Sequence, residues 1–600
     1  MTHKIVSDVQ IIKENYDSPV EILEGLNFSQ KDTIKMVEFY SNSRYLGGQK
    51  DEKGREKAFY QILNGMCDVE NAAVDIDTKD INITADDKES YIDSFLLSKD
   101  IYQWIKNENF AQTLNDMKKT RTKYGALLVK KCTYTKDGKK TLKLEVPEWK
   151  NVITDQIDIE NSPIIEVHYM TPMEIMKKKE WKNTEDILKE ASKMPGKRIK
   201  IYEVRGEFPV SYFNEVDGRK TTSKETEFSY QLYILGGSVE GKNNMSQANL
   251  MKPLYWENNT EKVYKYLSRK PKSGRAFGVG VFEEGEQAQV QINDVILKQN
   301  RALEYTSKVV GQSASKKLKG RNMYNEVEDG TILEHEENKP ITALNLMPTG
   351  GLGQYENIRE QWYQQIERSM SAYSAQRGDT PPSGTPFRLQ ASVLQQSSNV
   401  FEEIQEEFGI FITQIFNDWI IPFLSSTLNK EHLLAHDFSV EELQWMDKNI
   451  AQNAANRKIK EMILNGEDIT PQTEQAIIGE TMTDLAGTKN TRFFKMLKDS
   501  YKDVKYKVTV NVTGEQKNKA AVMETINNIL TLYISNPNLA TDPVAMQLFM
   551  KLVEISGAGI SPVSLQSALQ QRQSQSPQET TAQPPQPQDL SLEANPTQNA

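Results

Sequence analysis

The residues best suited to chemistry form a glycine-rich motif near the middle of the chain. The segment Gly236–Asn243 (GGSVEGKN) follows a strand-like stretch and fits the pattern GxxxxGK of a phosphate-binding loop. Such a loop cradles phosphates with backbone N–H groups and ends on a serine or threonine that holds magnesium. Here that last position is Asn243, so the magnesium ligand is missing. We therefore interpret the segment as a hairpin turn, and keep a nucleotide-using enzyme built on Gly236–Lys242 as an alternative.

Histidine and cysteine spacings indicate no further site. His432 and His436 are four residues apart, but a zinc protease needs a glutamate directly after the first histidine and a third ligand. Cys67 and Cys132 stand alone without a CxxC spacing, so we interpret them as reduced thiols. A GxSxG nucleophile motif is missing as well. The sequence therefore predicts no catalytic residue, no metal site and no cofactor.

Length and charge limit the class of protein. A chain of 600 residues is too long for one core and predicts several structural regions. Its formal net charge of -10 argues against a general nucleic-acid binder, although an acidic wall suits DNA that must slide past without sticking. Without an apolar run of about 18 residues we expect no membrane span, and the N-terminus lacks an apolar signal core. We therefore expect a protein that stays in, or is assembled in, the cell interior.

A helix–loop–helix pattern between residues 350 and 424 is the most informative part of the sequence. Apolar residues at helical spacing predict a first helix over 352–376, with a face made of Tyr355, Ile358, Trp362, Ile366, Met370 and Tyr373. Three prolines and two glycines then predict a loop, which consists of Arg377, Gly378, Asp379, Thr380, Pro381, Pro382, Ser383, Gly384, Thr385 and Pro386. A second amphipathic helix begins near residue 389, and Pro422 should kink or end it. The two apolar faces are interpreted as packing surfaces. Because few other segments of the same chain are nearby to cover them, packing between copies of the chain is favoured.

Basic residues gather at two places near these helices, and two interpretations stay open for each. One cluster contains Lys316, Lys317, Lys319 and Arg321, and the other contains Arg368, Arg377 and Arg388 around the Pro/Gly loop. The first cluster either contacts nucleic acid or an acidic partner, or is a solvated turn. The second either contacts DNA phosphates or forms salt bridges with Glu367, Asp379 and Glu402.

The order of the remaining elements predicts an α+β fold that is mainly helical. Strand-like Gly125–Val129 and Leu142–Val146 flank the turn residues Lys136-Asp137-Gly138 and predict a hairpin inside a mixed α/β region. A long helix over 283–310 and a strand-and-turn segment over 311–351 precede the helix–loop–helix. A strand over 506–512 and two helices follow it, and from about residue 570 a Gln/Pro-rich tail should be disordered.

This order resembles the portal (head–tail connector) proteins of tailed double-stranded DNA bacteriophages. The wing of such a portal resembles segment 120–131. The first stem helix, where it enters the clip, resembles segment 278–303. The second stem helix with the tunnel loop and the long wing helix resembles segment 365–409. In detail the chain is most similar to portals of podovirus-like phages, including the crAss-like group. The resemblance implies wing residues 1–280 and 389–515, stem helices 281–310 and 351–377, a clip at 311–350, a tunnel loop at 378–388, a helical crown at 516–569 and a tail at 570–600.

The resemblance also implies a function without catalysis. Portals of this family form a twelve-subunit ring at one capsid vertex of the virion, through which double-stranded DNA is packaged and ejected. They bind the terminase large subunit, then tail or head-completion adaptors, and sit within the major capsid protein shell, away from any membrane. For this chain, the stem helices would line the channel and the loop at 378–386 would face DNA. An acidic helical scaffold or adaptor without a channel is the alternative from another class.

Overall fold

The computed structural model of this chain describes residues 3–76, 78, 81–85, 91–136, 138–192, 196–219, 227–239, 251–306, 310–314, 316, 337–340, 342–344, 352–370, 387–427, 440–466, 471–486 and 506–510. The chain divides into two compact units. The first contains Met1–Asn429 and Ser500–Gln516, and the second contains Lys430–Asp499 and Lys517–Ala600. Nearly all of the described sheet and helix packing belongs to the first unit.

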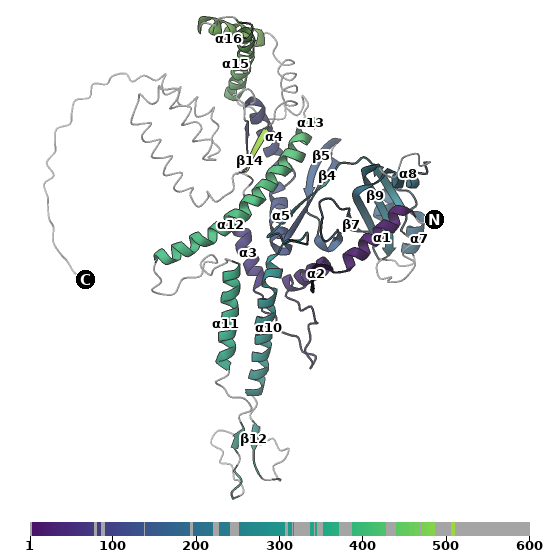
Figure 1. Cartoon of the computed structure of the whole chain (residues 1–600), viewed down its shortest axis with the longest axis vertical. Helices are drawn as coiled ribbons and strands as arrows, with labels where there is room; N and C mark the ends of the chain where they lie inside the picture. Colours follow the sequence, from purple (N-terminus) through teal and green to yellow (C-terminus); the bar gives the residue numbers. More distant parts are fainter. Residues whose placement is uncertain are drawn as a thin grey trace, which may run out of the picture. The chain divides into compact units, whose positions relative to one another are not determined.

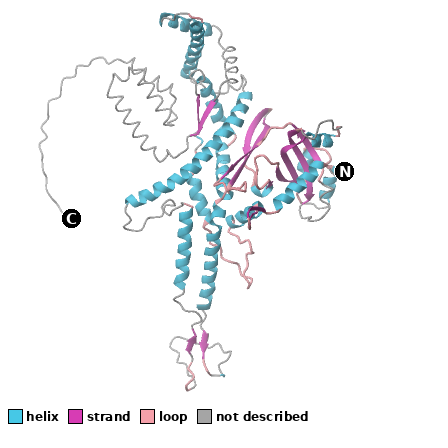
Figure 2. Ribbon diagram, viewed as in Figure 1, coloured by secondary structure: helices cyan, strands magenta, loops and turns pink. Residues whose placement is uncertain are grey.

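The fold is α+β, roughly half helical, with antiparallel sheets (Figures 1 and 2). The helices of the first unit are α1 Lys4–Asp17, α2 Gln30–Ser41, α3 Leu63–Ala73, α4 Tyr91–Asn107, α5 Phe110–Tyr124, α6 Pro172–Lys177, α7 Glu185–Ser192, α8 Val210–Asp217, α10 Val281–Thr306, α11 Leu352–Ser369, α12 Phe387–Ile415 and α13 Ile421–Thr427. The strands are β1 Val20–Leu23, β2 Leu26–Phe28, β3 Ile81–Ala85, β4 Ala126–Lys136, β5 Lys139–Glu145, β6 Val152–Ile153, β7 Ile164–Met170, β8 Ile199–Pro209, β9 Phe228–Val239, β10 Pro253–Asn258, β11 Tyr264–Ser268, β12 Val310–Gln312, β13 Thr342–Leu344 and β14 Tyr506–Val510.

A five-stranded antiparallel sheet in the order β10-β9-β8-β7-β6 forms the centre of the α/β body. Side chains alternate between its two faces along each strand. On β8, Tyr202 and Val204 pack with α1, whereas Ile201 on the opposite face packs with α6 and α7. The sheet is therefore covered by helices on both faces.

A second sheet in the order β11-β4-β5 lies beside the first and confirms the predicted hairpin. β4 and β5 pair from Lys130 opposite Glu145 to Lys136 opposite Lys139. Gly138 at the turn has a φ of 77°, a left-handed conformation that glycine adopts without steric cost. Gly138 therefore allows the tight connection between the two strands.

The predicted strand near residue 506 also exists, as β14, but its partner is remote in sequence. β14 pairs with β3, with Val508 opposite Ile83. Each strand is short, so neither would be stable without the other and the helices next to them. This strand pair places residues 506–510 beside residues 81–85 of the N-terminal part of the chain.

Pro422 does not end the long helix α12. A π-helical turn, Phe416–Ile420, follows α12 directly, and α13 then continues through Pro422 to Thr427. Proline lacks an N–H and clashes with the carbonyl four residues earlier in a regular α-helix. A wider π-helical turn just before it changes that register, so the chain stays helical through Pro422. Of the two predicted outcomes, a kink or an end, the end is wrong.

The second unit is described in two helices, α15 Val440–Leu464 and α16 Pro471–Ala486, which pack against each other. Across the described residues of both units, none of the helices is long and apolar enough to cross a membrane.

Candidate functional site

The most prominent candidate for function is an antiparallel pair of helices that extends from the α/β body. α10 and α11 lie side by side, and the short strands β12 and β13 belong to the connection between them (Figure 1). Ile366 and Met370, at the end of α11, lie next to Gly285, near the start of α10, so the two helices run in opposite directions. With 26 residues at about 1.5 Å each, α10 is about 40 Å long.

Close packing fixes the base of this pair. A Cβ atom on Gly285 would lie 2.8 Å from the Met370 side chain and 2.9 Å from that of Ile366, closer than van der Waals contact allows. Ile366 and Met370 are 2% and 5% exposed and belong to the same core as Leu63 of α3. The helix pair and the body therefore share one hydrophobic core at this junction.

Two polar residues of α10 are buried in this junction. Gln289 and Asn293 are 0% and 2% exposed. The Oε1 atom of Gln289 accepts a hydrogen bond from the backbone N–H of Ile62 at 3.1 Å, and Oδ1 of Asn293 accepts from that of Tyr60 at 2.8 Å. These bonds satisfy the backbone just before α3 and fix the rotation of α10 about its own axis. In the sequence, the signal for this role was that Gln289 and Asn293 are four residues apart on the otherwise apolar face of α10, and our interpretation missed it.

A buried ion network attaches α10 to the body. Arg269, which directly follows β11 and is 1% exposed, donates from Nε and Nη2 to the two carboxylate oxygens of Glu70 in α3, at 2.7 and 2.6 Å. Its Nη1 atom lies 3.3 Å from Glu284 of α10. Burial alone would lower the pKa of Arg269, but the charges of Glu70 and Glu284 outweigh it and raise the pKa, so the guanidinium stays charged. The network joins α3, β11 and α10 through one side chain.

Helix α12 is attached in a similar way. Arg121 of α5, 2% exposed, donates to the carbonyl oxygen of Ile404 at 2.9 Å and to the Glu407 carboxylate at 2.6 Å. The Nε atom of Arg121 is buried without a hydrogen-bond partner. Burial accordingly lowers the pKa of Arg121. Next to it along α5, Thr122 donates to Glu70 at 3.3 Å, which brings α12 close to the Arg269 network.

Three glycines allow the backbone to enter α10 at this point. Gly125, which ends α5, has a φ of 78°. A Cβ atom on Gly280 would lie 2.6 Å from the carbonyl oxygen of Lys123, and one on Gly278 would lie 2.8 Å from that of Gly125. Only glycine fits such backbone-to-backbone contact. The glycine-rich segment before α10 is therefore a tight junction between α10 and the α5–β4 corner.

The predicted apolar face of α11 is divided between covered and exposed positions. Ile366 and Met370 are buried against α10 and α3, and Trp362 packs partly against the same core. Tyr355 is half-buried, whereas Ile358 is 40% exposed. Tyr373 lies outside the described residues. Packing within the chain thus covers the apolar residues at the base of the helix pair. Farther along the pair some apolar side chains stay exposed, including Val290 of α10, whose exposed fraction is 43%.

Most predicted DNA-facing residues lie outside the described part of the chain. This holds for the loop residues 377–386 and for Lys317, Lys319 and Arg321. Lys316 and Arg368 are described and exposed, and Arg388 belongs to the first turn of α12. The choice between phosphate contacts and salt bridges for these residues therefore stays open.

The glycine-rich motif begins inside a strand. Gly236 pairs with Ile201 of β8, and Val239 ends β9. A Cβ atom on Gly237 would lie 2.6 Å from the ring of Tyr202, so this glycine serves sheet packing. Residues 240–250 lie outside the described part. Because the first half of the motif is an antiparallel strand, it does not resemble the strand–loop–helix of a phosphate-binding site. A turn after a strand remains the better interpretation.

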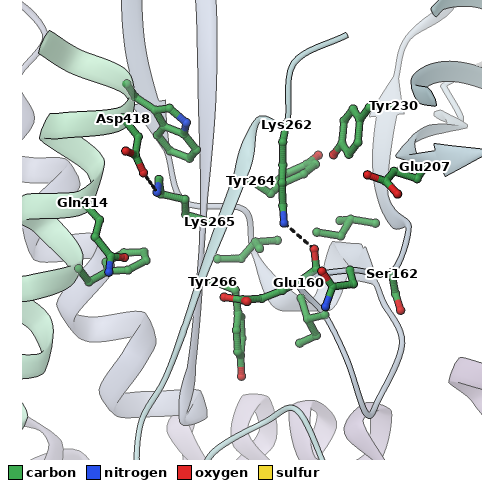
Figure 3. Close-up of a pocket in the computed structure, with 17 residues that line it drawn as sticks. Glu160, Ser162, Glu207, Tyr230, Lys262, Tyr264, Lys265, Tyr266, Gln414 and Asp418 are labelled. Atoms are coloured by element: carbon green, nitrogen blue, oxygen red, sulfur yellow. Dashed lines mark hydrogen bonds and ion pairs between the residues drawn. The ribbon is translucent and has the colours of Figure 1, made fainter. Parts of the chain in front are cut away.

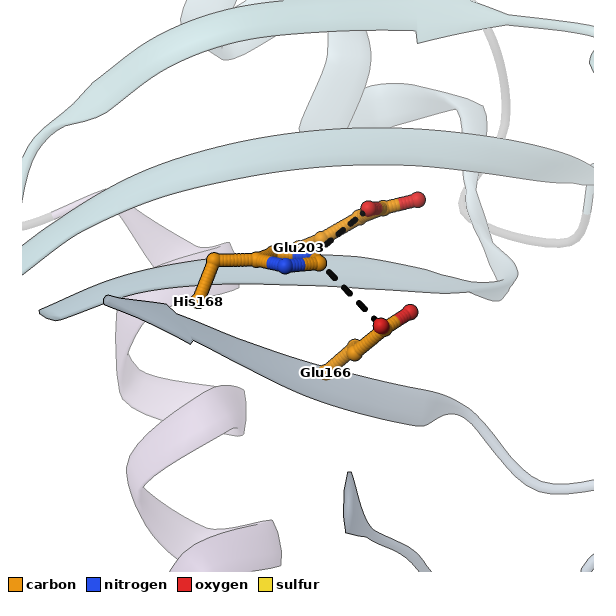
Figure 4. Close-up of side chains that lie close together, drawn as sticks. All are labelled: Glu166, His168 and Glu203. Atoms are coloured by element: carbon orange, nitrogen blue, oxygen red, sulfur yellow. Dashed lines mark hydrogen bonds and ion pairs between the residues drawn. The ribbon is translucent and has the colours of Figure 1, made fainter. Parts of the chain in front are cut away.

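A cluster of charged side chains joins the two sheets. Glu166, His168 and Glu203 lie close enough to act as ligands of one metal ion (Figure 4). However, the ammonium of Lys130 lies 2.7 Å from Glu166 and 2.9 Å from Glu203. Burial alone would lower the pKa of Lys130, but the two carboxylates raise it. The lysine therefore supplies the positive charge that a metal would bring, and it links β4 to β7 and β8.

The Glu203 carboxylate is held ionised by its neighbours. Burial would raise its pKa, but the hydrogen bond from His168 at 2.9 Å and the charges of Lys130 and Arg205 lower it strongly. The Tyr264 hydroxyl donates to Glu166 at 3.1 Å. All of these groups are paired with one another, so the cluster is suited to structure rather than to proton transfer.

A cavity of about 460 Å³ lies between β11, the loop before β7 and the helix α12 (Figure 3). Aromatic side chains form much of its wall, and both lysines that line it are held by neighbouring groups. Lys265 forms an ion pair with Asp418 and lies 5.5 Å from the centre of the Trp419 ring. Lys262 donates to the carbonyl oxygen of Glu160 at 2.7 Å. Among the described residues that line the cavity, this arrangement does not place a nucleophile next to a base.

Comparison with models of known protein families and with curated proteins finds no match for this chain.

The two thiols are poor candidates for a reactive site, because burial raises the pKa of both Cys67 and Cys132, the latter to about 12. The candidate functional feature is therefore the helix pair with its buried attachment.

Replacing Lys130 with methionine should destabilise the fold by about 3 to 5 kcal/mol at pH 7, because Glu166 and Glu203 would stay buried without their cation. Urea unfolding followed by tryptophan fluorescence measures the change. Lys131→Met is the matched control on the same strand, since Lys131 pairs with Glu261, whose side chain is 78% exposed. That control should cost less than about 1 kcal/mol. Equal losses for the two variants would contradict the role of Lys130.

The same pair of proteins tests the charge state of Glu203. Its pKa is lower in the folded than in the unfolded chain, so it stabilises the fold above the unfolded value of about 4.3, and this stabilisation is lost as the pH falls through the folded pKa. Without Lys130, Glu203 loses one of the charges that lower its pKa and protonates at higher pH, so the deficit of Lys130→Met should shrink from pH 7 to about pH 4. A deficit independent of pH would contradict this cause.

Arg269→Met should cost about 3 to 5 kcal/mol, because Glu70 would be left buried and unpaired. Urea unfolding again measures it. Glu70→Gln added to this variant should restore part of the loss by removing the uncompensated charge. Arg55→Met is the control, since Arg55 also pairs with two carboxylates, Asp51 and Glu304, but at the surface, and it should hardly change the midpoint. A loss after Arg55→Met as large as that after Arg269→Met would show that burial does not decide the effect.

Proposed function

We propose that this chain is a portal protein, which assembles into a ring at one capsid vertex and provides the channel for packaging and ejection of double-stranded DNA. One observation carries the proposal. An antiparallel pair of long helices extends from an α/β body, has a small two-stranded insert in its connection, and is followed by the long helix α12. This is the order wing, stem, clip, stem and wing that the sequence resemblance implies.

The chemistry of the helix pair supports a passage for DNA. Acidic residues outnumber basic ones on both α10 and α11. An acidic wall repels phosphates and keeps DNA from sticking. The exposed apolar residues Val290 and Ile358 offer contact area for neighbouring copies. In this proposal the pair forms the stem, and the ring guides DNA without catalysing a reaction.

The expected partners follow from the same proposal. Twelve copies form the ring within the shell of the major capsid protein. The terminase large subunit docks during packaging, and tail or head-completion adaptors dock afterwards, on the connection between α10 and α11. The loop at residues 378–386 faces the DNA.

Purified full-length protein should form rings with a central hole in negative-stain electron microscopy. Val290→Lys/Ile358→Lys should reduce ring formation without lowering the stability of the single chain, because both side chains are exposed there. Gln291→Lys/Asn357→Lys is the control, with the same charge change at exposed neighbouring positions. A wild-type chain that stays monomeric at high concentration would overturn the proposal, and equal loss of rings in both variants would overturn the role of the apolar positions.

Shortening the loop 378–386 should leave rings intact but reduce the amount of DNA packaged or retained. The measurement is nuclease-protected DNA in a packaging reaction with proheads and the cognate terminase, beside micrographs of the same variant. Unchanged packaging and retention would show that this loop does not act on DNA.

A further inference from the structure

Strand β11 lies at the edge of its sheet, and part of its backbone faces away from the neighbouring strand. In the sheet order β11-β4-β5, its neighbour in the described residues is β4. The N–H of Lys131 donates to the carbonyl oxygen of Val263 at 2.8 Å, and the register carries this pairing to every second residue of β11. The residues between them turn their N–H and C=O groups to the free edge. These residues are Tyr264, Tyr266 and Ser268, and within the described part of the chain no hydrogen bond reaches their backbone groups.

The cavity between β11, the loop before β7 and α12 runs past this free edge (Figure 3). Side chains alternate along β11, so Tyr264 and Tyr266 belong to one face of the sheet and Lys265 to the other. All three line the cavity. Lys265 points towards Asp418 of α12, whereas the tyrosine face packs with Ile159 in the loop before β7. A space bordered from both faces of an edge strand must include the edge itself.

The free edge is deeply placed at one of its three residues. Tyr264 is 2% exposed, yet its outward N–H and C=O lie beside a cavity instead of a strand. Buried backbone groups in proteins are nearly always hydrogen-bonded. An added strand would pair the outward groups of all three residues at once, whereas a small molecule would reach only some of them. The edge therefore fits an extended peptide better than a compact ligand.

The side chains around the edge determine which kind of strand fits. On the tyrosine side, Glu160 and Glu207 line the cavity, and neither carboxylate has an ion-pair partner among the described residues. The lysine on that side, Lys262, donates to the carbonyl oxygen of Glu160. On the α12 side, the wall contains the aromatic rings of Phe411 and Trp419. Because a strand alternates its side chains, a segment with basic residues on one side and apolar residues on the other matches both walls.

We propose that the free edge of β11 binds an extended segment of a partner protein in which basic residues alternate with apolar ones. The segment adds a strand to the sheet β11-β4-β5. In this mode of recognition, main-chain hydrogen bonds supply affinity and the surroundings of alternate side chains supply specificity. The site belongs to the α/β body, and binding needs neither the α10–α11 helix pair nor a ring. The proposal can therefore fail while the portal function stands.

The test measures binding of full-length protein to a fluorescein-labelled, acetylated heptapeptide of alternating lysine and valine by anisotropy. Two further peptides carry N-methyl groups, one on the lysines and one on the valines. Only one of these two sets of N–H groups can face β11, so one methylated peptide should bind at least about tenfold more weakly and the other should change little. A peptide with glutamate in place of lysine should also bind about tenfold more weakly, because the two carboxylates repel it.

The matching change in the protein is Glu160→Gln/Glu207→Gln, which should weaken binding of the lysine–valine peptide about tenfold by removing two ion pairs. Glu180→Gln/Glu185→Gln is the control, because it changes the net charge equally at exposed positions that do not line the cavity. It should bind the peptide like the wild type. Equal weakening in both double variants would show a general charge effect and contradict the site.

Three other results would overturn the proposal. Absence of binding, or equal binding of both methylated peptides, would show that the edge does not accept a strand. Displacement by spermidine as effective as that by unlabelled peptide would assign the cavity to a small organic cation. Binding to single chains but not to rings would assign the edge to a neighbouring copy of this chain instead of a separate partner.

Discussion

The buried pair of Arg269 and Glu70 is the interaction on which the arrangement of the first unit depends. It joins residues 199 positions apart in the chain, and its bidentate geometry fixes both distance and orientation. Taking these charges out of water is costly, so the pair forms only when α3, the end of β11 and the start of α10 are all in place. Through Glu284 the same guanidinium reaches α10, and through Thr122 the Glu70 carboxylate reaches α5. A single ionic centre thus determines where the helix pair leaves the body.

Around this centre, backbone contacts and packing leave the helix pair little freedom. Gly278 and Gly280 bring the chain against the end of α5 at distances that no side chain tolerates. Gln289 and Asn293 then hold the backbone before α3, so α10 cannot rotate without breaking buried hydrogen bonds. Arg121 attaches α12 to the same region of α5. In the proposed ring, a load applied to the stem by moving DNA would pass directly into the body, because the two share one core.

Strand β4 shows how one sequence feature serves two physical roles. Lys130 is buried between Glu166 and Glu203, where its charge links the two sheets. One residue later the strand leaves its neighbour β11, and Lys131 pairs with Glu261, whose side chain is 78% exposed. Burial between two carboxylates makes Lys130 a structural cation, whereas the ion pair of Lys131 with an exposed glutamate contributes little to stability. The same residue type therefore acts differently according to what the tertiary structure places beside it.

Local patterns in the sequence were sufficient for several elements. Helical spacing of apolar residues predicted α10, α11 and α12, and the Asp137-Gly138 turn predicted the β4–β5 hairpin, since periodicity and turn chemistry act within a few residues. They did not show that β14 pairs with β3, that Arg269 finds Glu70, or that Lys130 lies between Glu166 and Glu203. Nor did the apolar face of α11 reveal that Met370 is covered while Ile358 is exposed. A pattern reports which side of an element is apolar or charged. Only the tertiary structure decides what covers that side, because the partners are far away along the chain.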